Sequence, residues 1–449
     1  MDISQATLDF ISRHADDDPR QLALQGSRDP QVDTAFALQQ IAGRQTARQK
    51  LPSWAATDGL VYPPHLSLEQ CSSEQTARYK ARLITQRNSA QQLPSNSPPL
   101  QGAGWPKGRG GVKGQGWGLY STFADLTGGL GVDFSFMAPH FAKAYYVERQ
   151  PTLCGIARHN LPLLGLPTAQ VVSADGVEFL QQSQQHFDWV FIDPARRDAH
   201  GSRTYGISDC TPDVLSMLSL LREKADHVLL KLSPMLDWRK AVSDIGPNLV
   251  SEVHIVSVAN ECKELLVVVE CGGLNVEGES FVECGVLNVE GDYSIHCVNL
   301  LPDGEQHFEY NPSQHISFNT PHSTFNESPY LYEPNASIMK AGCFNELAAH
   351  FGVSQVAPNS HLFTSDRLVP DFPGRQFVIE AVTTMNKREL RQYLQGITQA
   401  NIAVRNFPLT AADLRRRLKL ADGGPTYIFA TTLADHTHVL LVCRKAVFV

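Results

Sequence analysis

Apolar residues recur along this chain in two different rhythms, which divide it into regions. Over residues 1–87 they recur at helical spacing, so this region is predicted to be mainly helical; one clear set is Ala35, Leu38 and Ile41. From 123 to 270, short apolar runs alternate with amphipathic segments. Such alternation predicts strands that alternate with helices, in a mostly parallel sheet covered on both faces.

The central region is predicted to begin with parallel strands and to end with a hairpin. Five apolar runs are predicted to form its parallel strands, at 123–125, 145–148, 169–173, 189–192 and 227–232. Two further runs, 253–258 and 265–270, flank the polar segment 259–264 and are predicted to form a hairpin. We therefore expect a parallel sheet that finishes with an antiparallel pair.

A helix is also expected immediately before the central region. Ser67 is predicted to open it, and the helix leads through Ala77 to Lys80. Its dense polar residues favour a solvated helix face, and the alternative is a helix laid over a ligand site.

The remaining regions differ in composition. Residues 88–120, rich in Gln, Ser, Pro and Gly, are predicted to form a flexible insertion, and 121–272 form the central domain. Residues 273–329 are predicted to be a β-rich extension, with a decapeptide that begins at Val269 recurring, with one change, at Val282. The last third is predicted to be α/β, as a small connecting domain over 330–375 and a further module over 376–449.

Composition narrows the functional classes. A net charge of −8 and a pI near 6 give no overall attraction to nucleic acid, so RNA binding would need a local basic patch. The nine cysteines are scattered without a Cys-x-x-Cys pair, which favours free thiols in a reducing cytoplasm and no metal site. Neither an apolar run of about 18 residues nor a secretory signal is present, so we expect no membrane contact.

Candidate chemistry gathers where the predicted strands end. Asp125 ends the first strand, and a tight turn with Thr127, Gly128, Gly129 and Gly131 follows it. Carboxylates stand after the next strands as well, namely Glu148, Asp175 and Asp193. Because ligands of open α/β sheets bind beyond the carboxyl ends of the strands, these acids are expected to face one crevice. The alternative is that each acid only caps the following helix.

These motifs resemble the class I S-adenosylmethionine-dependent methyltransferases over residues 123–270. The resemblance implies an α/β Rossmann-like fold and S-adenosyl-L-methionine as the cofactor. Asp125 and the turn Thr127, Gly128, Gly129 and Gly131 would hold its methionine end. Glu148 would accept the ribose hydroxyls, and Asp175 with Gly176 would meet the adenine. The terminal hairpin distinguishes this arrangement from a dehydrogenase Rossmann domain.

The segment Asp193-Pro194-Ala195-Arg196-Arg197-Asp198 resembles the acceptor motif of amino-methyltransferases. The resemblance implies that Asp193 and Pro194 orient the target amino group. Arg196 stands where an aromatic residue stacks on the base, and a guanidinium can also stack or hold a phosphate. Arg196 and Arg197 can equally pair with nearby acids.

Further candidates for substrate contact lie at the strand ends and in the hairpin, where the crevice is expected. They are Lys231, Asn260 and Lys263, although Lys231 can instead extend from the sheet edge to solvent.

Asp-Pro-x-Arg also resembles the 5-methyluridine methyltransferases, which use a cysteine nucleophile. Ser233 stands where that cysteine would be, and an unactivated hydroxyl is a poor substitute for a thiolate. Cys210 and Cys262, in loops expected near the crevice, are the only cysteines expected close enough to replace it, and the alternative is that they have no role. Covalent chemistry at carbon is therefore disfavoured.

The chain as a whole resembles a bacterial methyltransferase family with a THUMP-like C-terminal domain, from Ala77-Arg78-Tyr79-Lys80 to the terminal module. THUMP domains are associated with tRNA-modifying enzymes, so the resemblance implies an RNA substrate. The function expected is methylation of a base nitrogen in structured RNA (tRNA or rRNA), with Arg415, Arg416 and Arg417 as the best basic patch. The alternatives are a protein or small-molecule methyltransferase, or a non-catalytic RNA-binding factor that retains the fold.

Overall fold

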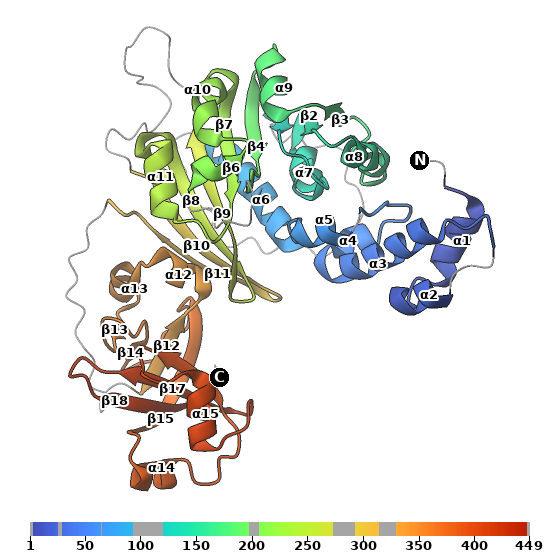
Figure 1. Cartoon of the computed structure of the whole chain (residues 1–449). Helices are drawn as coiled ribbons and strands as arrows, with labels where there is room; N and C mark the ends of the chain where they lie inside the picture. The colour runs from blue at the N-terminus through green and yellow to red at the C-terminus, as the bar shows by residue number, and fades with distance from the viewer. Residues whose placement is uncertain are drawn as a thin grey trace, which may run out of the picture. The chain divides into compact units, whose positions relative to one another are not determined.

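The computed structural model describes residues 3–25, 29–63, 65–92, 120–196, 206–272, 292–313 and 329–446. The chain divides into two compact units (Figure 1). The described part of the first unit runs to residue 232 and includes 239–250 and 267–272. The second contains 233–238, 251–266 and the described residues from 292 onward. Of the insertion predicted at 88–120, residues 93–119 lie outside the described residues, as does most of the repeat; residues 88–92 belong to the helix that ends at Gln92.

The first unit begins with helices, as predicted. They are α1 (Gln5–Arg13), α2 (Pro19–Gln25), α3 (Thr34–Lys50), α4 (Pro52–Ala55), α5 (His65–Gln70) and α6 (Glu74–Gln92). Apolar residues of α3 to α6 pack around Trp54 and Tyr62 and reach Leu130 and Val132, which follow the strand β1 (Tyr120–Asp125). Helices α3 to α6 therefore pack against the segment that carries the glycine-rich turn.

The helix expected from Ser67 through Ala77 is two helices. The chain leaves α5 at Gln70, and α6 begins only at Glu74, after the Ser73 hydroxyl accepts a hydrogen bond from the Thr76 N–H at 3.2 Å. The prediction of a solvated face for this segment is wrong, because α6 packs against α7 (Val132–Met137) and Lys80 is fully buried.

Five parallel strands form the centre of the first unit. In spatial order they are β3 (Gln170–Ser173), β2 (Phe141–Glu148), β1 (Tyr120–Asp125), β4 (Phe187–Ile192) and β7 (Ala225–Leu232). The same order continues through β9 (Glu261–Glu270) to β8 (Val250–Val258). The predicted α/β sheet is thus confirmed, and its central residues are buried as expected for strands covered on both faces.

Helices alternate with these strands along the chain (Figure 1). Besides α7 they are α8 (Pro151–Leu163), α9 (Gly176–Gln182), α10 (Val214–Lys224) and α11 (Trp238–Ile245), with short 3-10 turns at Ala138–His140, Ile207–Asp209 and Pro247–Leu249. The short strands β5 (Ala195–Arg196) and β6 (Cys210–Thr211) pair with each other beyond β4.

The strand register fixes where the candidate acids lie. Asp125 is opposite Tyr146 of β2 on one side and Phe191 of β4 on the other. Glu148 therefore follows two residues beyond Tyr146, and Asp193 follows two residues beyond Phe191, at the same edge of the sheet. One edge consequently carries the carboxyl ends of β2, β1 and β4.

The hairpin has a tighter turn than the sequence suggested. Only Ala259 and Asn260 connect β8 to β9, and their φ angles of 49° and 66° are both positive. Two consecutive positive φ angles are typical of the type I′ turn that joins antiparallel strands. Residues 261–264 therefore belong to β9, and Lys263 lies on a strand instead of in the turn.

The second unit adds two strands next to β8. Strand β10 (Ser294–Leu301) runs parallel to β8, and β11 (Gly304–Tyr310) returns antiparallel to β10.

The same unit contains a seven-stranded sheet in the order β13-β14-β12-β15-β18-β17-β16. Its strands are β12 (Tyr330–Pro334), β13 (Ser354–Gln355), β14 (Phe363–Ser365), β15 (Gly374–Thr383), β16 (Asn401–Arg405), β17 (Thr426–Thr432) and β18 (His438–Lys445). Its helices are α12 (Ala336–Ala341), α13 (Phe344–Phe351), α14 (Lys387–Tyr393) and α15 (Ala411–Leu418). Within the described ranges, no helix combines the length and apolar character needed to cross a membrane.

Candidate active site

The glycine-rich turn after β1 is shaped by Tyr146 of β2. A Cβ on Gly128 would collide with the Tyr146 ring, so only glycine permits the turn to lie against it. The Tyr146 hydroxyl donates a hydrogen bond to the carbonyl oxygen of Gly129. Gly131 then takes a φ of 84° as the chain enters α7, which a side chain would strain. Tyr146 therefore holds the turn in one conformation.

The turn forms one wall of a cavity of about 280 Å³ in the first unit. Most predicted site residues line it, namely Asp125, Thr127, Gly128, Gly129, Gly131, Glu148, Asp175, Gly176, Asp193 and Lys231. Sequence reasoning did not single out several other lining residues, among them Gln70, Cys71, Ser72, Asp133, Gln150 and Thr211. Pro194 is buried and is not part of the described lining.

Three of the acids on this lining accept hydrogen bonds from nearby backbone. Asp125 Oδ1 accepts from the Thr127 N–H at 2.9 Å, and Asp175 Oδ1 accepts from the Val177 N–H at 2.9 Å as the cap of α9. Glu148 accepts from Gln150 N–H at 2.8 Å and from Gly129 N–H at 2.9 Å. Local capping is thus real, but each carboxylate oxygen has a second lone pair, so capacity for a ligand remains.

Asp125 is the most perturbed of these acids. Its side chain is almost completely buried, and this burial raises the pKa well above the usual range of a carboxyl. The Thr127 N–H works in the opposite direction, whereas the charges of Asp133 and Asp193 raise the pKa further. A cationic ligand group placed against Asp125 would favour its ionised form.

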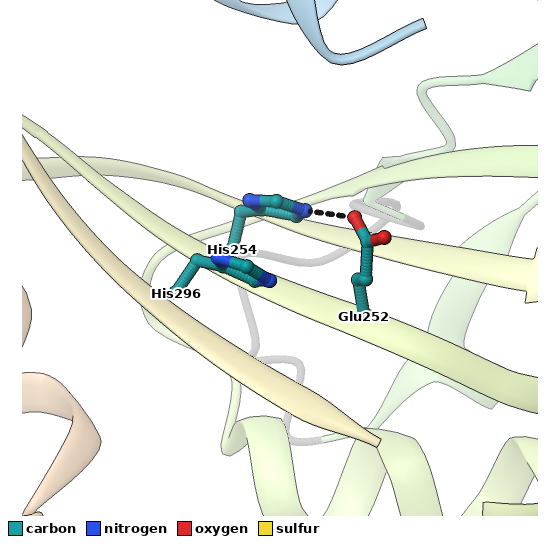
Figure 2. A group of neighbouring side chains, drawn as sticks. All are labelled: Glu252, His254 and His296. Atoms are coloured by element: carbon teal, nitrogen blue, oxygen red, sulfur yellow. Dashed lines mark hydrogen bonds and ion pairs between the residues drawn. The ribbon is translucent and has the colours of Figure 1, made fainter. Parts of the chain in front are cut away.

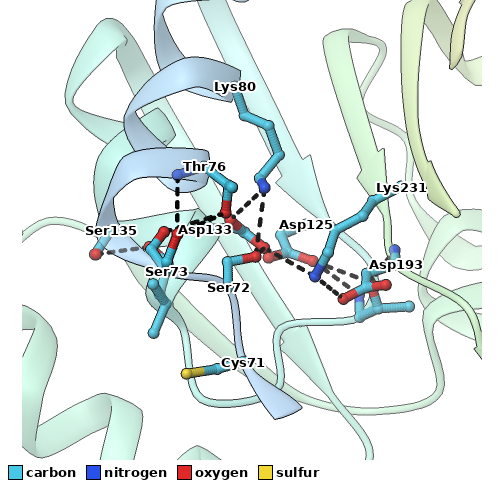
Figure 3. A network of polar contacts seen from close by, with 12 residues as sticks. Cys71, Ser72, Ser73, Thr76, Lys80, Asp125, Asp133, Ser135, Asp193 and Lys231 are labelled. Atoms are coloured by element: carbon cyan, nitrogen blue, oxygen red, sulfur yellow. Dashed lines mark hydrogen bonds and ion pairs between the residues drawn. The ribbon is translucent and has the colours of Figure 1, made fainter. Parts of the chain in front are cut away.

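A chain of alternating charges runs from Asp193 into the N-terminal helices (Figure 3). Lys231 Nζ lies 2.6 Å from Asp193 Oδ2 and 3.5 Å from Asp133 Oδ2. Lys80 Nζ lies 3.1 Å from the other oxygen of Asp133. Burial opposes ionisation of Asp133, but Lys80 and Lys231 outweigh it, so the pKa of Asp133 is lowered. Asp133 is therefore a buried anion held between two cations.

The break between α5 and α6 supplies a further contact to this chain of charges. The Ser72 hydroxyl donates to Asp133 Oδ2 at 2.7 Å, and Lys80 Nζ donates to the Ser72 oxygen at 3.3 Å (Figure 3). In the sequence, the sign of this buried contact was a lysine, Lys80, within a segment predicted to be helical. Its partner could not be identified, because Asp133 lies 53 positions away on another helix.

Thr127 joins the turn to the segment after β4. Its hydroxyl accepts a hydrogen bond from the backbone N–H of Asp193 at 2.7 Å, while its own N–H donates to Asp125. The side chain of Asp193 remains 40% exposed beside the cavity. One threonine thus fixes the spacing between the glycine-rich turn and Asp193.

The predicted substrate contacts do not all converge on this cavity. Arg196 lies on β5 with its backbone opposite Cys210, whereas its side chain and all of Arg197 are outside the described residues. Asn260 and Lys263 belong to the second unit. There Asn260 Oδ1 accepts from the Ala336 N–H at 2.8 Å, and Lys263 pairs with Glu261 at 2.7 Å. Asn260 thus has a structural role at the start of α12.

The described thiols near these segments are poor nucleophiles. Burial raises the pKa of Cys71, on the cavity lining, to about 11. Cys210 is almost fully buried, and burial raises the pKa of Cys262, in the second unit, to about 11. The thiols of Cys71 and Cys262 are therefore protonated near neutral pH, and a protonated thiol attacks carbon poorly. Covalent chemistry at carbon is not favoured by these two side chains.

The lining fits the cofactor that the sequence implied. A side chain on Gly128 would meet Tyr146 and one on Gly176 would meet the Leu126 carbonyl, so packing requires glycine at both of these positions on the lining. Asp125 suits an ammonium group, and Glu148 suits a pair of hydroxyls. Both requirements belong to an α-amino acid joined to a ribonucleoside.

Known proteins with similar sequence and structure agree with this geometry. Family models match a ferredoxin-like domain at residues 330–373 and a THUMP-like domain at 374–445, which confirms the predicted kind of C-terminal module. The chain is 32% identical to a Porphyromonas gingivalis W83 protein assigned as a methyltransferase. The match to its crystal structure covers 98% of both chains with a TM-score of 0.78.

A second similarity involves Mycobacterium tuberculosis. The chain is 25% identical over 327 residues to an uncharacterised S-adenosylmethionine-dependent methyltransferase of strains CDC 1551 and H37Rv. The match covers 72% of this chain and 81% of that protein.

Proposed function

Since this chain belongs to the bacterial class I S-adenosylmethionine-dependent methyltransferases with a THUMP-like C-terminal domain, we propose that it methylates a base nitrogen in structured RNA. The observation that carries the proposal is the position of Asp193. Its carboxylate lines the same cavity as the glycine-rich turn, and only one of its oxygens is held by Lys231. The other oxygen is directed to no described partner and can accept a hydrogen bond from the methyl acceptor.

The roles proposed for the cavity residues follow from their hydrogen-bonding capacity. Asp125 accepts from the ammonium group of the cofactor, and Glu148 accepts from its ribose hydroxyls. Asp175 and Gly176 border the adenine. S-adenosylmethionine supplies an activated methyl group on a sulfonium, so the protein needs chiefly to position the acceptor.

Asp193 is proposed to orient the acceptor. A carboxylate that accepts a hydrogen bond from an amino group turns the nitrogen lone pair toward the cofactor. Lys231 is better described as a positioning residue than as a substrate contact, because it lies 2.6 Å from Asp193 and close to Asp133. This arrangement suits a nitrogen acceptor, which needs no covalent attachment to the enzyme.

Support for RNA comes from the THUMP-like match at 374–445 and from basic residues on two of its helices. Helix α14 contains Lys387, Arg388 and Arg391, and α15 contains Arg415, Arg416 and Arg417. The overall charge of −8 favours the alternative of a protein or small-molecule substrate. An RNA-labelling experiment distinguishes the two classes of substrate.

The test separates cofactor binding from transfer. Calorimetric titration with S-adenosylmethionine is followed by labelled-methyl transfer to total cellular RNA and to total protein. The unaltered enzyme should bind the cofactor and label RNA. Asp193→Ala removes the hydrogen-bond acceptor and should retain cofactor affinity and lose transfer. Glu148→Gln should weaken cofactor binding roughly 10- to 150-fold through lost charge-assisted hydrogen bonds.

One control variant and two defined outcomes make the test decisive. Glu178→Gln changes an exposed acid on α9 and should alter neither property. Full turnover of Asp193→Ala at saturating cofactor would exclude the proposed orienting role. Labelled protein without labelled RNA would replace RNA with a protein substrate.

A further inference from the structure

A row of polar side chains crosses one face of the strands β8, β10 and β11 in the second unit. His254 of β8 is the register partner of His296 on β10, and His296 is in turn opposite Glu309 on β11. Glu252 lies two residues before His254 on β8, and His307 lies two residues before Glu309 on β11. Because side chains alternate along a strand, the two members of each pair lie on the same face of the sheet. Three imidazoles and two carboxylates therefore lie side by side.

The β11 end of this row has the spacing of a metal site. His296 Nδ1 lies 3.2 Å from His307 Nε2 and 3.7 Å from Glu309 Oε2. The ligand atoms of the three residues all lie within 4.8 Å of one another. We propose that His296, His307 and Glu309 bind a divalent transition-metal ion of the zinc class.

These separations suit a four-coordinate ion. With metal–nitrogen and metal–oxygen distances of about 2.0–2.2 Å, neighbouring ligand atoms in a tetrahedron are roughly 3.3–3.5 Å apart. The observed 3.2 and 3.7 Å lie on either side of that spacing, and the third pair, His307 and Glu309, lies within 4.8 Å. Two imidazoles and one carboxylate form a ligand set that suits zinc and leaves a fourth position for water.

Ser294 prepares His296 for this role. Its hydroxyl lies 2.7 Å from His296 Nε2, the ring nitrogen remote from His307. A proton on Nε2 can be donated to Ser294, which leaves Nδ1 unprotonated with its lone pair toward His307 and Glu309. Hydrogen bonding at the second ring nitrogen is a regular feature of metal-bound histidines.

The β8 end of this row is a weaker candidate for a metal site. The ligand atoms of Glu252, His254 and His296 also lie within 4.8 Å of one another. His254 Nε2 is 2.9 Å from Glu252 Oε2, as Figure 2 shows. However, the His254 and His296 rings are stacked 4.4 Å apart at an angle of only 12°. Imidazoles bind metals along in-plane lone pairs, and rings stacked this closely direct those lone pairs along separate planes. The His296 and His307 rings are also nearly parallel, at 7°, but their centroids are 5.4 Å apart and their facing nitrogens are 3.2 Å apart, so both lone pairs can be directed at one ion.

The proposed ion would connect adjacent strands. His296 belongs to β10, whereas His307 and Glu309 belong to β11, so the metal would cross-link the antiparallel pair in addition to its backbone hydrogen bonds. Sequence analysis predicted no metal site, because the nine cysteines lack the paired spacing of a cysteine-based site. A pair of ligands on β11 two residues apart was the only local signal.

The test uses the full-length, tag-free protein after removal of metals with a chelator. Titration with Zn²⁺ by calorimetry should give one tight equivalent, and Co²⁺ should produce the visible absorption of a four-coordinate complex. His307→Gln and Glu309→Gln each should weaken binding by at least about tenfold. Zn²⁺ should raise the unfolding temperature of the unaltered protein and leave that of His307→Gln unchanged.

Matched histidine variants identify the ligands. His254→Gln removes the stacked neighbour and His436→Gln an exposed imidazole in a turn, and both should preserve the tight equivalent. Equal Zn²⁺ affinity of the unaltered protein and His307→Gln would overturn the proposal. Loss of binding in His254→Gln with retention in His307→Gln would also overturn it, because the ion would then belong to the Glu252 end.

Discussion

At the scale of single residues, Asp125 combines a functional requirement with a cost in stability. The carboxyl is buried in the ligand-free protein, and burial raises its pKa above that in an unfolded chain. Between these two pKa values the folded state holds a proton that the unfolded state has lost. The free energy of unfolding therefore falls as pH rises through this interval.

Asp125→Asn should remove that pH-dependent loss. The asparagine carbonyl can still accept the Thr127 N–H, so the turn should persist. Above the interval the variant should be more stable than the unaltered protein, by about 1.4 kcal/mol for each unit of pKa elevation removed. Urea unfolding at several pH values measures the difference, and calorimetry should show weaker cofactor binding. A variant that is less stable than the unaltered protein at neutral pH would contradict this account.

The sequence predicted those site residues whose position depends only on the strand that precedes them. Asp125, Glu148 and Asp193 follow buried strands, and parallel pairing brings such positions to one edge. It did not predict Asp133, Ser72 or the role of Lys80 in the site. Their contacts depend on how helices pack onto the sheet, which no local pattern specifies.

At the scale of elements, α6 is anchored to α7 through a buried charge. Lys80 is fully buried, and its charge is balanced by Asp133. Removing one member of such a pair leaves the other buried without its full compensation. The cost is reduced here, because Asp133 also contacts Lys231 and Ser72.

Lys80→Met should therefore lower the free energy of unfolding by about 3 kcal/mol, whereas combining it with Asp133→Leu should recover part of that loss. Arg78→Gln on the same helix breaks a partly exposed pair with Glu74 and should cost under about 1 kcal/mol. Urea unfolding of the four proteins provides the comparison. Equal costs for Lys80→Met and Arg78→Gln would show that burial of the pair has no energetic weight.

Element types were predictable, but two connections were not. The alternating pattern predicted the strands and helices of the sheet because their apolar residues repeat with different periods. The break at residues 71–73 depends on a capping serine inside an otherwise helical pattern. The turn at Ala259 and Asn260 lacks the glycine that usually indicates two positive φ angles.

At the scale of the whole molecule, the negative net charge makes RNA binding dependent on local basic surfaces. Arg416 of α15 is 79% exposed and pairs only with partly exposed Asp413 among its described ion pairs, and Arg417 beside it is exposed. Each exposed arginine that contacts a phosphate contributes about one unit to the salt dependence of binding.

Arg416→Gln together with Arg417→Gln should weaken binding of structured RNA and reduce the slope of log affinity against log salt by about 1–2. Lys240→Gln, on α11, removes one exposed charge elsewhere and should have little effect. Filter-binding measurements at several salt concentrations test this. An unchanged slope in the double variant would remove α15 from the RNA-binding surface.

Contacts between residues far apart along the chain could not all be predicted from the sequence. The strand order follows from alternation and from the terminal hairpin, but the histidine row does not. His254 and His296 are 42 positions apart, and they meet only because β10 pairs in parallel with β8. A parallel neighbour can come from any distance along a chain, so its side-chain partners are not apparent from composition or spacing.

The hydrogen bonds of Thr127 have a thermodynamic consequence. Its hydroxyl holds the backbone of Asp193 and its N–H holds Asp125, so the proposed cofactor and acceptor groups share one structural link. If occupation of either side makes this link more ordered, the second ligand loses less conformational entropy on binding. Reciprocity then requires that the factor by which cofactor raises RNA affinity equals the factor by which RNA raises cofactor affinity.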